Sequence, residues 1–550
     1  MTPRVRPMGE RAFLLEVDAL EEVLALHAAL AERRPDGVVD LVPAARTVLV
    51  RIDPRGLALP TARTWALAAA AEAAPRGPSA TREVELDVVY DGPDLADTAR
   101  LLGLSADELV RAHAAARWQV AFTGFAPGFG YLVSDDWPFD VPRLDTPRTR
   151  VPTGAVGLAG AFTGAYPRDT PGGWRLIGTT PAPLFDPDAA SPALLAPGTR
   201  VRFRPPARQG SAAPGEASAR GLGASRPGDG PTREAAHGGS GEAAGGRPGE
   251  AAAGGSGAVA AGGIRILEPG LLTTVQDLGR PGVASVGVAV SGALDRAALR
   301  TANRLLGNPE SAAGLEVTMG GLRAVAERDL WVSVAGAWGV VRLDGREIDP
   351  YQAHAWPAGA ELHLDWFVHG ARGYIAARGG VDAPHALGSR ATDLLAGLGP
   401  AALRAGDVVG VRDEVSAPIP VAPPAAWGAP HDDELELELA PGPRADWFAP
   451  AALEALFDTV WTVSNHADRV GARLDGPALV RVRGGELASE GMVPGALQVP
   501  PSGRPTILLA DGPVTGGYPV IAVVTDASLD LVAQARPGTR IRFRHARVVV

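Results

Sequence analysis

Three acidic residues in the second half of the chain have the type and the setting needed for proton transfer. The segment TTVQDLGRPG places Asp277 in a turn bounded by glycine and proline. SGALDRAALRTAN places Asp295 at the start of an expected helix, and GLEVTMGG places Glu316 on an expected strand. A carboxylate held close to a substrate can accept a proton, so these three are our candidate catalytic residues. A structural role stays open as well, because Asp277 can close its turn and Asp295 can cap its helix.

Residues suited to binding an anion occur beside these carboxylates. Gln276 and Arg280 share the turn of Asp277. Ser291 precedes the expected helix, whose N-terminus suits a carboxylate or a phosphate. The segment SNHADRVGARLDG carries Arg469 and Arg473, and a guanidinium recognises a carboxylate through paired hydrogen bonds. We therefore predict that the second half binds an anionic group.

A further group of candidates lies in the first half, in segments rich in glycine, proline, aromatic residues and arginine. They are FTGFAPGFGYL, PRLDTPRTRVPTGAVGLAG and TGAYPRDTPGGW, and together they span 122–174. The backbone amides of a GG turn can bind an anion, and nearby arginines would add positive charge. The alternative is that these segments are only the turns of a β-barrel. The candidate binding residues here are Phe125, Pro127, Arg143, Arg148, Gly172 and Gly173.

Two residue types are missing from the chain, and each absence removes a class of chemistry. Without cysteine there is no disulfide, no thiolate metal site and no cysteine nucleophile. The chain contains no lysine, so all 52 of its basic residues other than histidine are arginine. The chain therefore lacks the lysine of a Walker A loop, of a Schiff-base enzyme and of a biotin carrier. His363 and His369 have only Asp365 as an acidic residue between them, so we predict no metal site.

Charge and hydropathy bear on the partners and location of the protein. The formal net charge of −10 argues against nucleic acid as the main partner. No apolar run approaches the ~20 residues that cross a bilayer. The N-terminal residues show no apolar signal-peptide region. We therefore predict a cytoplasmic protein that binds a small molecule and neither nucleic acid nor a membrane.

The elements that must position these candidates indicate several domains, as expected for 550 residues. Residues 1–90 follow the order β-α-β-β-α-β, which is typical of a ferredoxin-like module. Residues 91–205 begin with helical segments and continue as short strands. Residues 206–262 are almost entirely Gly, Ala, Pro, Ser, Glu and Arg, so we expect a disordered linker. A Pro/Ala-rich patch divides the remainder into domains at 263–418 and 430–550.

An internal repeat relates the first half to the second. PGTRVRFR (Pro197–Arg204) recurs as PGTRIRFR (Pro537–Arg544). GFGYL, VPTGAV and TPGGW have weaker counterparts, in the same order, in VGARL, VPGAL and VTGGYP. RAGDVVGVR (Arg404–Arg412) is a weaker third copy of the first element. Because many short strands with Gly/Pro turns are typical of barrels, we predict a mainly β protein with α+β character and about three related barrel units.

The quoted segments of the first half resemble the B subunit family of 5-oxoprolinase, also described as allophanate hydrolase subunit 1-like. TTVQDLGRPG, SGALDRAALRTANRLLGN, GLEVTMGG, RGGVDAPHALGSRAT and PGALQVPPSGRPTILLADGPVTGGYP resemble the C subunit family, described as allophanate hydrolase subunit 2-like. The resemblance covers nearly the whole chain outside 206–262. It adds Arg390 and Gln498, which lie in the last two motifs, to the candidate binding residues.

The resemblance implies cyclophilin-like barrels, a separate A subunit of 5-oxoprolinase as partner, and ATP with Mg²⁺ as its counter-ion. The implied reaction is the ATP-dependent opening of 5-oxo-L-proline to L-glutamate, in which phosphorylation of the lactam oxygen would activate the ring carbon for attack by water. The modules also resemble the carboxyltransferase domain of urea carboxylase, which would need biotin on a separate carrier because this chain has no lysine to bear it. A third resemblance is to a pair of proteins that regulates a sporulation kinase by binding.

The resemblance to two separate subunits also implies that the two halves of this chain contact each other. We expect residues 122–174 to face the second half. We also expect Arg148→Ala to abolish coupled turnover while the fold stays intact.

Overall fold

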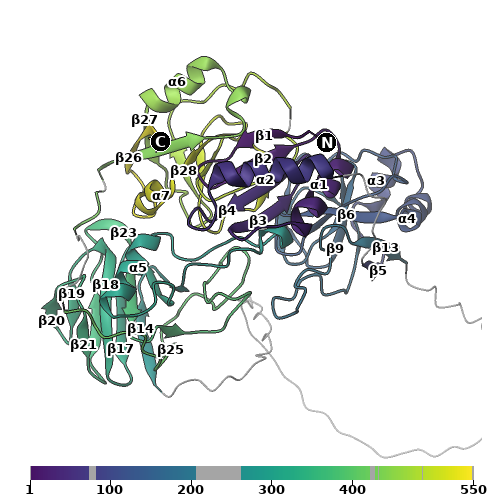
Figure 1. The fold of residues 1–550 in the computed structure, drawn as a ribbon. Helices are drawn as coiled ribbons and strands as arrows, with labels where there is room; N and C mark the ends of the chain where they lie inside the picture. The colour runs from purple at the N-terminus through teal and green to yellow at the C-terminus, as the bar shows by residue number, and fades with distance from the viewer. Residues whose placement is uncertain are drawn as a thin grey trace, which may run out of the picture. The chain divides into compact units, whose positions relative to one another are not determined.

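The computed structural model describes residues 2–73, 82–205, 262–421, 428–431, 433–485 and 487–547 (Figure 1). Within these ranges the chain forms 34 strands and seven α-helices, so the predicted mainly β class is confirmed. The predicted linker is 206–262, and all of it except residue 262 lies outside the described residues. None of the helices in the described ranges is long and apolar enough to cross a bilayer.

The N-terminal sheet is antiparallel, and its side chains alternate between two covered faces. Two helices pack on one face (Figure 1). Phe13 and Leu15 belong to the apolar core on that face. Ala12 and Leu14 point to the other face, which packs on apolar residues of the second half. The strand order is β1 (Arg4–Pro7), β2 (Ala12–Glu16), β4 (Thr47–Ile52) and β3 (Val38–Pro43), and the helices are α1 (Leu20–Glu32) and α2 (Leu59–Glu72).

The predicted ferredoxin-like order of this module is not confirmed. Its expected last strand is β5 (Glu83–Asp87), which does not join the N-terminal sheet. β5 pairs in parallel with β13 (Arg200–Arg204) in the next sheet. The outer position beside β2 is filled by β1, which the sequence patterns do not indicate. Acidic residues of β5 form ion pairs with arginines of β13, for example Glu85 with Arg204 at 3.0 Å.

The next sheet holds seven strands in the order β12-β9-β10-β7-β6-β13-β5. Its helices precede β6, and Ser105 with Glu108 forms a capping box at the start of α4. A separate two-stranded ribbon joins β8 to β11. The remaining elements are α3 (Leu95–Leu101), α4 (Ala106–Ala115), β6 (Trp118–Thr123), β7 (Gly130–Val133), β8 (Arg148–Val151), β9 (Ala155–Ala159), β10 (Phe162–Ala165), β11 (Thr170–Gly172) and β12 (Arg175–Thr179).

The C-terminal residues form a closed barrel in the order β26-β33-β30-β31-β28-β27-β34. A two-stranded ribbon, β29 with β32, accompanies it. The strands are β26 (Glu434–Pro441), β27 (Val460–Val463), β28 (Gly471–Asp475), β29 (Glu490–Gly491), β30 (Ala496–Gln498), β31 (Thr506–Leu508), β32 (Thr515–Gly516), β33 (Val520–Val524) and β34 (Arg540–His545), and the helices are α6 (Pro450–Asp458) and α7 (Asp526–Val532).

The strands of these two β units follow the same order, as the predicted repeat requires, although only the second sheet is a closed barrel. β34 pairs in parallel with β26 and antiparallel with β27, as β13 pairs with β5 and β6. Both units bury a tryptophan at an equivalent position, on β6 directly after α4 and on β27 directly after α6. The indole of Trp118 donates to the carbonyl of His113 at 2.9 Å, and that of Trp461 donates to the carbonyl of Leu456 at 3.0 Å. The exposed ion pairs recur too, with Arg544 lying 3.0 Å from Glu436.

The region between them has a different arrangement. Two sheets, β20-β19-β22-β17-β14-β25-β24 and β15-β16-β23-β18-β21, share one apolar core. The weaker third copy of the repeated element contains β25, which pairs antiparallel with both of its neighbours. It therefore lacks the parallel pairing of the other two copies.

A single helix, α5, packs on β18 and β23 in this region. The elements are β14 (Gly263–Pro269), β15 (Leu272–Gln276), α5 (Arg296–Leu305), β16 (Gly314–Thr318), β17 (Leu322–Ala326), β18 (Leu330–Trp338), β19 (Val341–Leu343), β20 (Arg346–Ile348), β21 (His354–Trp356), β22 (Glu361–Leu364), β23 (His369–Ala377), β24 (Val381–Asp382) and β25 (Val408–Val411).

Candidate functional site

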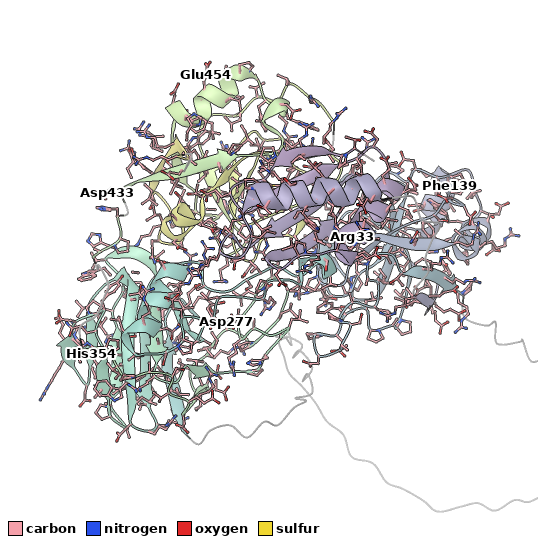
Figure 2. All side chains as sticks on the ribbon, viewed as in Figure 1. Arg33, Phe139, Asp277, His354, Asp433 and Glu454 are labelled. Carbon is pink, nitrogen blue, oxygen red and sulfur yellow. The ribbon has the colours of Figure 1, made fainter. Side chains whose placement is uncertain are left out.

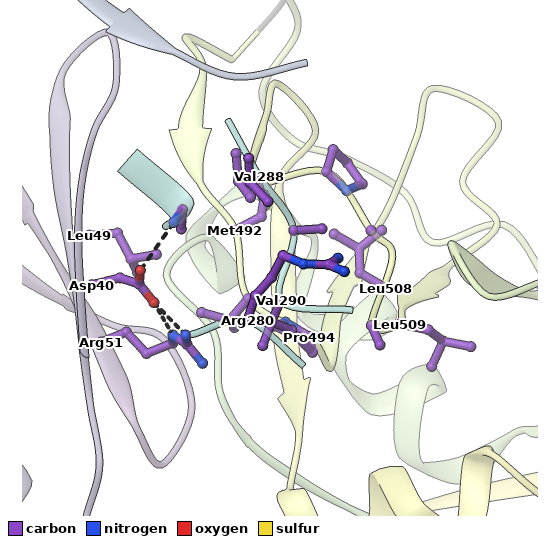
Figure 3. A pocket seen from close by; sticks show the side chains of 17 residues that line it. Asp40, Leu49, Arg51, Arg280, Val288, Val290, Met492, Pro494, Leu508 and Leu509 are labelled. Atoms are coloured by element: carbon purple, nitrogen blue, oxygen red, sulfur yellow. Dashed lines mark hydrogen bonds and ion pairs between the residues drawn. The ribbon is translucent and has the colours of Figure 1, made fainter. Parts of the chain in front are cut away.

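The two halves of the chain are joined by hydrogen bonds between buried or half-buried groups. The amide of Gly128 donates to the carbonyl of Val286 at 2.9 Å. The amide of Ala284 donates to Asp40 Oδ1 at 3.2 Å, and Arg51 Nε donates to Asp40 Oδ2 at 2.7 Å (Figure 3). Asp40 is 2% exposed, so the half-buried Arg51 neutralises a carboxylate that water hardly reaches. A cavity of about 30 Å³ adjoins this pair, which is room for about one water molecule.

A buried ionic network lies in the second half, centred on Arg469. Its Nη1 donates to Glu316 Oε1 at 2.6 Å, its Nε donates to Asp511 Oδ2 at 2.8 Å, and its Nη2 donates to the carbonyl of Gly292 at 2.6 Å. Arg469 is 5% exposed, and both carboxylates are 1% exposed. The network connects β16 with two loops of the closed barrel. It therefore brings together Glu316 and Arg469, which the sequence motifs present separately.

Glu316 is held as a carboxylate. Its Oε2 accepts hydrogen bonds from Tyr374 Oη at 2.7 Å and from the amide of Leu294 at 3.1 Å. Burial works to raise the pKa of Glu316, but the positive charges of Arg469 and Arg372 outweigh burial and lower it. Glu316 is consequently ionised at neutral pH. The groups that stabilise its charge all belong to the protein itself.

Asp295 has the opposite electrostatic setting. It caps α5 by accepting a hydrogen bond from the amide of Ala298 at 2.8 Å, and it accepts another from Gln534 Nε2 at 2.7 Å. Burial, with the nearby charge of Asp530, raises the pKa of Asp295 to about 7. Two carboxyl groups with separated pKa values are a pattern found in acid–base sites. Both of these groups are buried, and each also has a structural role.

Ser291 connects the network to an open space. Its hydroxyl donates to Asp511 Oδ1 at 2.7 Å, and its backbone has a φ of 52°. A positive φ is uncommon for a residue other than glycine, and such strain occurs often at functional positions. Ser291 also lines a cavity of about 210 Å³ between segments of the two halves. It is the one predicted site residue among those lining that cavity.

The predicted turn residues near Asp277 hold a neighbouring loop. Asp277, labelled in Figure 2, accepts hydrogen bonds from Ser389 Oγ at 2.6 Å and from the amide of Arg390 at 2.7 Å. Gln276 Nε2 donates to the carbonyl of Thr392 at 3.0 Å. Arg280 is 2% exposed, and its Nε donates to the carbonyl of Ala386. Each of these predicted residues therefore fixes the segment 386–392 against β15.

Three further predictions for the second half lie apart from the network. The side chain of Arg390 donates to Asp382 Oδ1 at 3.0 Å. Arg473 has a side chain that is 51% exposed and donates to the carbonyl of His466. Gln498 is buried on β30, beside Gly516. The structure does not bring these three together with Arg469.

Arg148 of the first half has a buried partner. Its Nη2 donates to Asp94 Oδ1 at 2.7 Å, and its Nη1 donates to the carbonyl of Trp174 at 3.4 Å. Asp94 also accepts a hydrogen bond from the amide of Leu176 at 2.7 Å. These contacts all lie inside the first half. Arg143 is exposed, and its charge acts to lower the pKa values of Tyr131 and Tyr166, which burial raises.

The remaining predicted residues surround a group of aromatic rings. Phe125 has a φ of 66° and is 42% exposed, with its ring edge-on to those of Phe129 and Tyr166. Pro127 is buried in the same loop. A Cβ at Gly172 would lie 2.7 Å from Tyr166 Oη, so glycine allows this close approach, whereas Gly173 has more space. The loop does face the second half, because a Cβ at Gly124 would lie 1.8 Å from Thr515 Oγ1.

Several residues of the site were missed by the sequence analysis. Asp511, Tyr374 and Gln534 complete the buried network, but they are separated from their partners by long stretches of chain. Arg300 was missed as well, and it lines the cavity of about 210 Å³ together with Arg296. The sequence does indicate that these two lie together, because arginines four residues apart share one face of a helix. Among the described residues, no three His, Asp or Glu side chains cluster as metal ligands would.

Comparison with known proteins places this architecture in a family. Residues 286–545 match the family described as carboxyltransferase domain, subdomain A and B, and residues 3–195 match carboxyltransferase domain, subdomain C and D. The chain belongs to the carboxyltransferase-domain family. Its two matched regions correspond to the two halves on either side of residues 206–261.

Within that family the chain combines homologues of two enzyme subunits. It is 37% identical over 287 residues to the C subunit of 5-oxoprolinase from Escherichia coli (strain K12), a match that covers 51% of this chain and 90% of that protein. It is 40% identical over 210 residues to the B subunit of 5-oxoprolinase from Escherichia coli O157:H7, covering 36% of this chain and 94% of that protein. The chain is thus homologous to the B and C subunits in one polypeptide, as its motifs predicted.

The same arrangement of both halves occurs in a solved structure. The crystal structure of TTHA0988 is 36% identical in sequence, has a TM-score of 0.78, and matches over 97% of this chain and 99% of that chain. Urea amidolyase of Lachancea kluyveri is more distant. It is 32% identical over 306 residues, which cover 50% of this chain and 16% of that enzyme.

Proposed function

We propose that this chain is the joined B and C component of an ATP-dependent 5-oxoprolinase, which opens the lactam of 5-oxo-L-proline to L-glutamate in the cytoplasm together with a separate A subunit. One observation carries the proposal: each half is homologous to a different 5-oxoprolinase subunit over at least 90% of that subunit's length. The buried contacts between the halves support a single working unit. Glu16 of the first half, for example, lies 2.7 Å from Arg444 of the second.

The architecture supports the finer parts of this proposal. We assign the two repeated β units as cyclophilin-like barrels that correspond to the predicted domains at 91–205 and 430–550, the first unit extended by β5, which lies before residue 91. Their shared strand order supports that assignment. The domain at 263–418 is the third barrel-like unit of the proposal, and its two sheets around one core support a half-barrel arrangement.

Nucleotide binding belongs to the partner protein in this proposal. The chain has no lysine for a Walker A loop. The cavity that Ser291 lines, of about 210 Å³, is smaller than the ~300–1,000 Å³ of typical ligand pockets, so this cavity does not fit a nucleotide. Two larger hollows, of about 530 and 510 Å³, lie elsewhere on the second half. In this proposal no step on this chain involves ATP or Mg²⁺. Its part is to bind and orient the lactam while the partner provides the nucleotide.

The test is a reconstituted reaction. The purified chain is mixed with a homologue of the A subunit, ATP and 5-oxoproline, and glutamate and ADP are measured against each component alone. We expect glutamate to form only in the complete mixture. If the mixture forms no glutamate but carboxylates urea in the presence of a carboxylated biotin carrier, the urea carboxylase alternative replaces this proposal. Tight binding to a histidine kinase without turnover would favour the regulatory alternative.

A further inference from the structure

The cavity of about 210 Å³ is built by both halves of the chain. Its first-half wall is the connection between β1 and β2, Met8–Ala12, together with Arg51 of β4. Its second-half wall includes Ser291, the first turns of α5 and the segment Val493–Pro494 of the closed barrel. None of these segments encloses the space by itself. A ligand in the cavity would therefore contact both subunit-like halves at once.

Positive charge dominates the polar part of this cavity. Four arginines line it, Arg11, Arg51, Arg296 and Arg300, against two carboxylates, Glu10 and Asp526. Arg296 and Arg300 lie one helical turn apart and present the same face of α5. Arg51 is directly opposite Ala12 in the sheet, which sets it next to Arg11. The lining thus carries an excess of cationic groups that converge from two elements.

These arginines disfavour one another in the absence of an anion. Burial, followed by the charge of Arg296, lowers the pKa of Arg11 and also that of Arg300. Two of the arginines have acidic partners, because Arg296 Nε lies 3.2 Å from Asp530 and Arg11 forms an ion pair with Asp526. Arg300 is less well satisfied, because its buried Nε has no hydrogen-bond partner and lies 3.7 Å from Glu310. An anion among these groups would relieve their repulsion and complete the hydrogen bonding of Arg300.

The rest of the lining is apolar and the space is small. Leu278, Val290, Leu294, Val493 and Leu509 form much of the wall. A volume of about 210 Å³ corresponds to roughly seven water molecules at ~30 Å³ each. The shape and chemistry therefore suit a small anion whose body is compact and largely apolar. A nucleotide is too large, and a bare inorganic ion would leave the apolar wall uncovered.

We propose that this cavity binds a small monocarboxylate, with the carboxylate held by Arg11 and Arg300 and the body packed against the apolar wall. Resting on the proposed function, the ligand is 5-oxoproline, whose carboxylate is attached to a compact lactam ring. The site explains how B-like and C-like parts share one substrate. It also predicts discrimination against glutamate, because that product brings an ammonium group toward a cationic lining.

Binding to the isolated full-length chain tests this inference separately from turnover. Isothermal titration compares 5-oxoproline with 2-pyrrolidinone, which has the same ring without the carboxylate, and with inorganic phosphate. We expect 5-oxoproline to bind at least tenfold more tightly than either compound. Arg11→Gln and Arg300→Gln should each weaken its binding at least tenfold. Arg100→Gln is the matched control, because that side chain is 76% exposed on α3 and should leave the affinity unchanged.

The outcomes separate the cavity from the proposed reaction. Thermal melting of each variant shows whether it is folded, and Arg11, whose side chain is 47% exposed, is the change expected to disturb the fold least. Equal affinity in the wild type, Arg11→Gln and Arg300→Gln would overturn the assignment even if the complete mixture forms glutamate. Equal binding of 2-pyrrolidinone or phosphate would overturn it as well. Selective, arginine-dependent binding of 5-oxoproline without glutamate formation in the mixture would support the cavity and refute the reaction.

Discussion

Replacing Arg469 by methionine removes the cation at the centre of the buried network. The substitution keeps an unbranched side chain of similar reach, so it tests the charge more than the volume. In the variant, Glu316 and Asp511 would face each other as buried carboxylates without their shared cation. The carbonyl of Gly292 would also lose its donor. The loss therefore falls on the contact between β16 and the loops of the closed barrel.

The expected loss of stability depends on which hydrogen bonds Glu316 and Asp511 keep in the variant. Removing one member of a buried ion pair typically costs about 3–5 kcal/mol, because the remaining charge stays desolvated. Glu316 keeps its bonds from Tyr374 and Leu294, and Asp511 keeps its bond from Ser291. We therefore expect a loss near the lower end, about 3 kcal/mol in the free energy of unfolding. Adding Glu316→Gln should recover about 1 kcal/mol, since it removes one of the unpaired charges.

The pH dependence of stability provides a second measurement of the role of Arg469. Glu316 has a pKa lowered below 4.5 in the folded chain, so its pairing stabilises the fold above pH 4.5 and is lost as pH falls through the folded pKa. In Arg469→Met the share of that contribution that comes from Arg469 is missing, while the share from Arg372 remains. The difference in stability between wild type and variant should thus be largest near neutral pH and shrink as pH falls below 4.5.

Urea unfolding followed by tryptophan fluorescence measures the difference, because Trp461 is fully buried in the closed barrel. Arg473→Met is the matched control, since that arginine is 51% exposed and its replacement should change stability by no more than about 0.5 kcal/mol. A variant at position 469 that unfolds at the same urea concentration as this control would refute the reasoning. So would a stability difference that is independent of pH.

Three other substitutions test separate parts of the structure. Gly124→Ala should weaken the contact between the halves, because the new Cβ would lie 1.8 Å from Thr515 Oγ1. Cleavage within 206–261 followed by gel filtration should then release the halves, whereas Gly484→Ala, which has open space, should not release them. The wild type should lose stability as pH rises from 3.8 to about 7, because the pKa of Asp295 is raised in the folded chain. Asp295→Asn should remove this decline. Thermal melts across this pH range would contradict the assignment if both proteins decline equally. Arg148→Ala should lower stability by about 1–3 kcal/mol, because Asp94 loses its charged partner. Measuring thermal melting and coupled turnover together separates this effect from the loss of activity expected from the sequence. Unchanged melting would refute a stabilising role for the pair of Arg148 and Asp94.

Local patterns in the sequence predicted the repeated units well. The near-identical segments that contain β13 and β34 occupy the same position in the two units, because the same side chains meet equivalent neighbours in each. The capping box of Ser105 and Glu108 is likewise a local feature, because its two residues are three positions apart. These features depend on residues that are close in the chain or on direct repetition. The family motifs likewise identified both subunit homologies.

Features that depend on distant pairing were not accessible from the sequence. β5 has an alternating pattern that fits either sheet, and its true partner is more than a hundred residues away. Arg469 is of a type suited to carboxylate recognition, yet its partners Glu316 and Asp511 are themselves protein groups. The cavity arginines Arg11 and Arg300 come from opposite halves, so no spacing rule connects them. Their convergence follows only from the packing of the two halves.

The ion pairs between β5 and β13 and between β26 and β34 have a consequence for assembly. In both units the acidic strand comes first in the chain, the arginine strand comes last, and the two pair in parallel. The charges consequently do not distinguish β13 from β34 as a partner for β26. Correct pairing must rely on the first unit closing before the second is available, as happens when domains fold in order during synthesis. When the complete chain refolds from denaturant, both units are available at the same time. Their last strands could then be exchanged between units or between molecules.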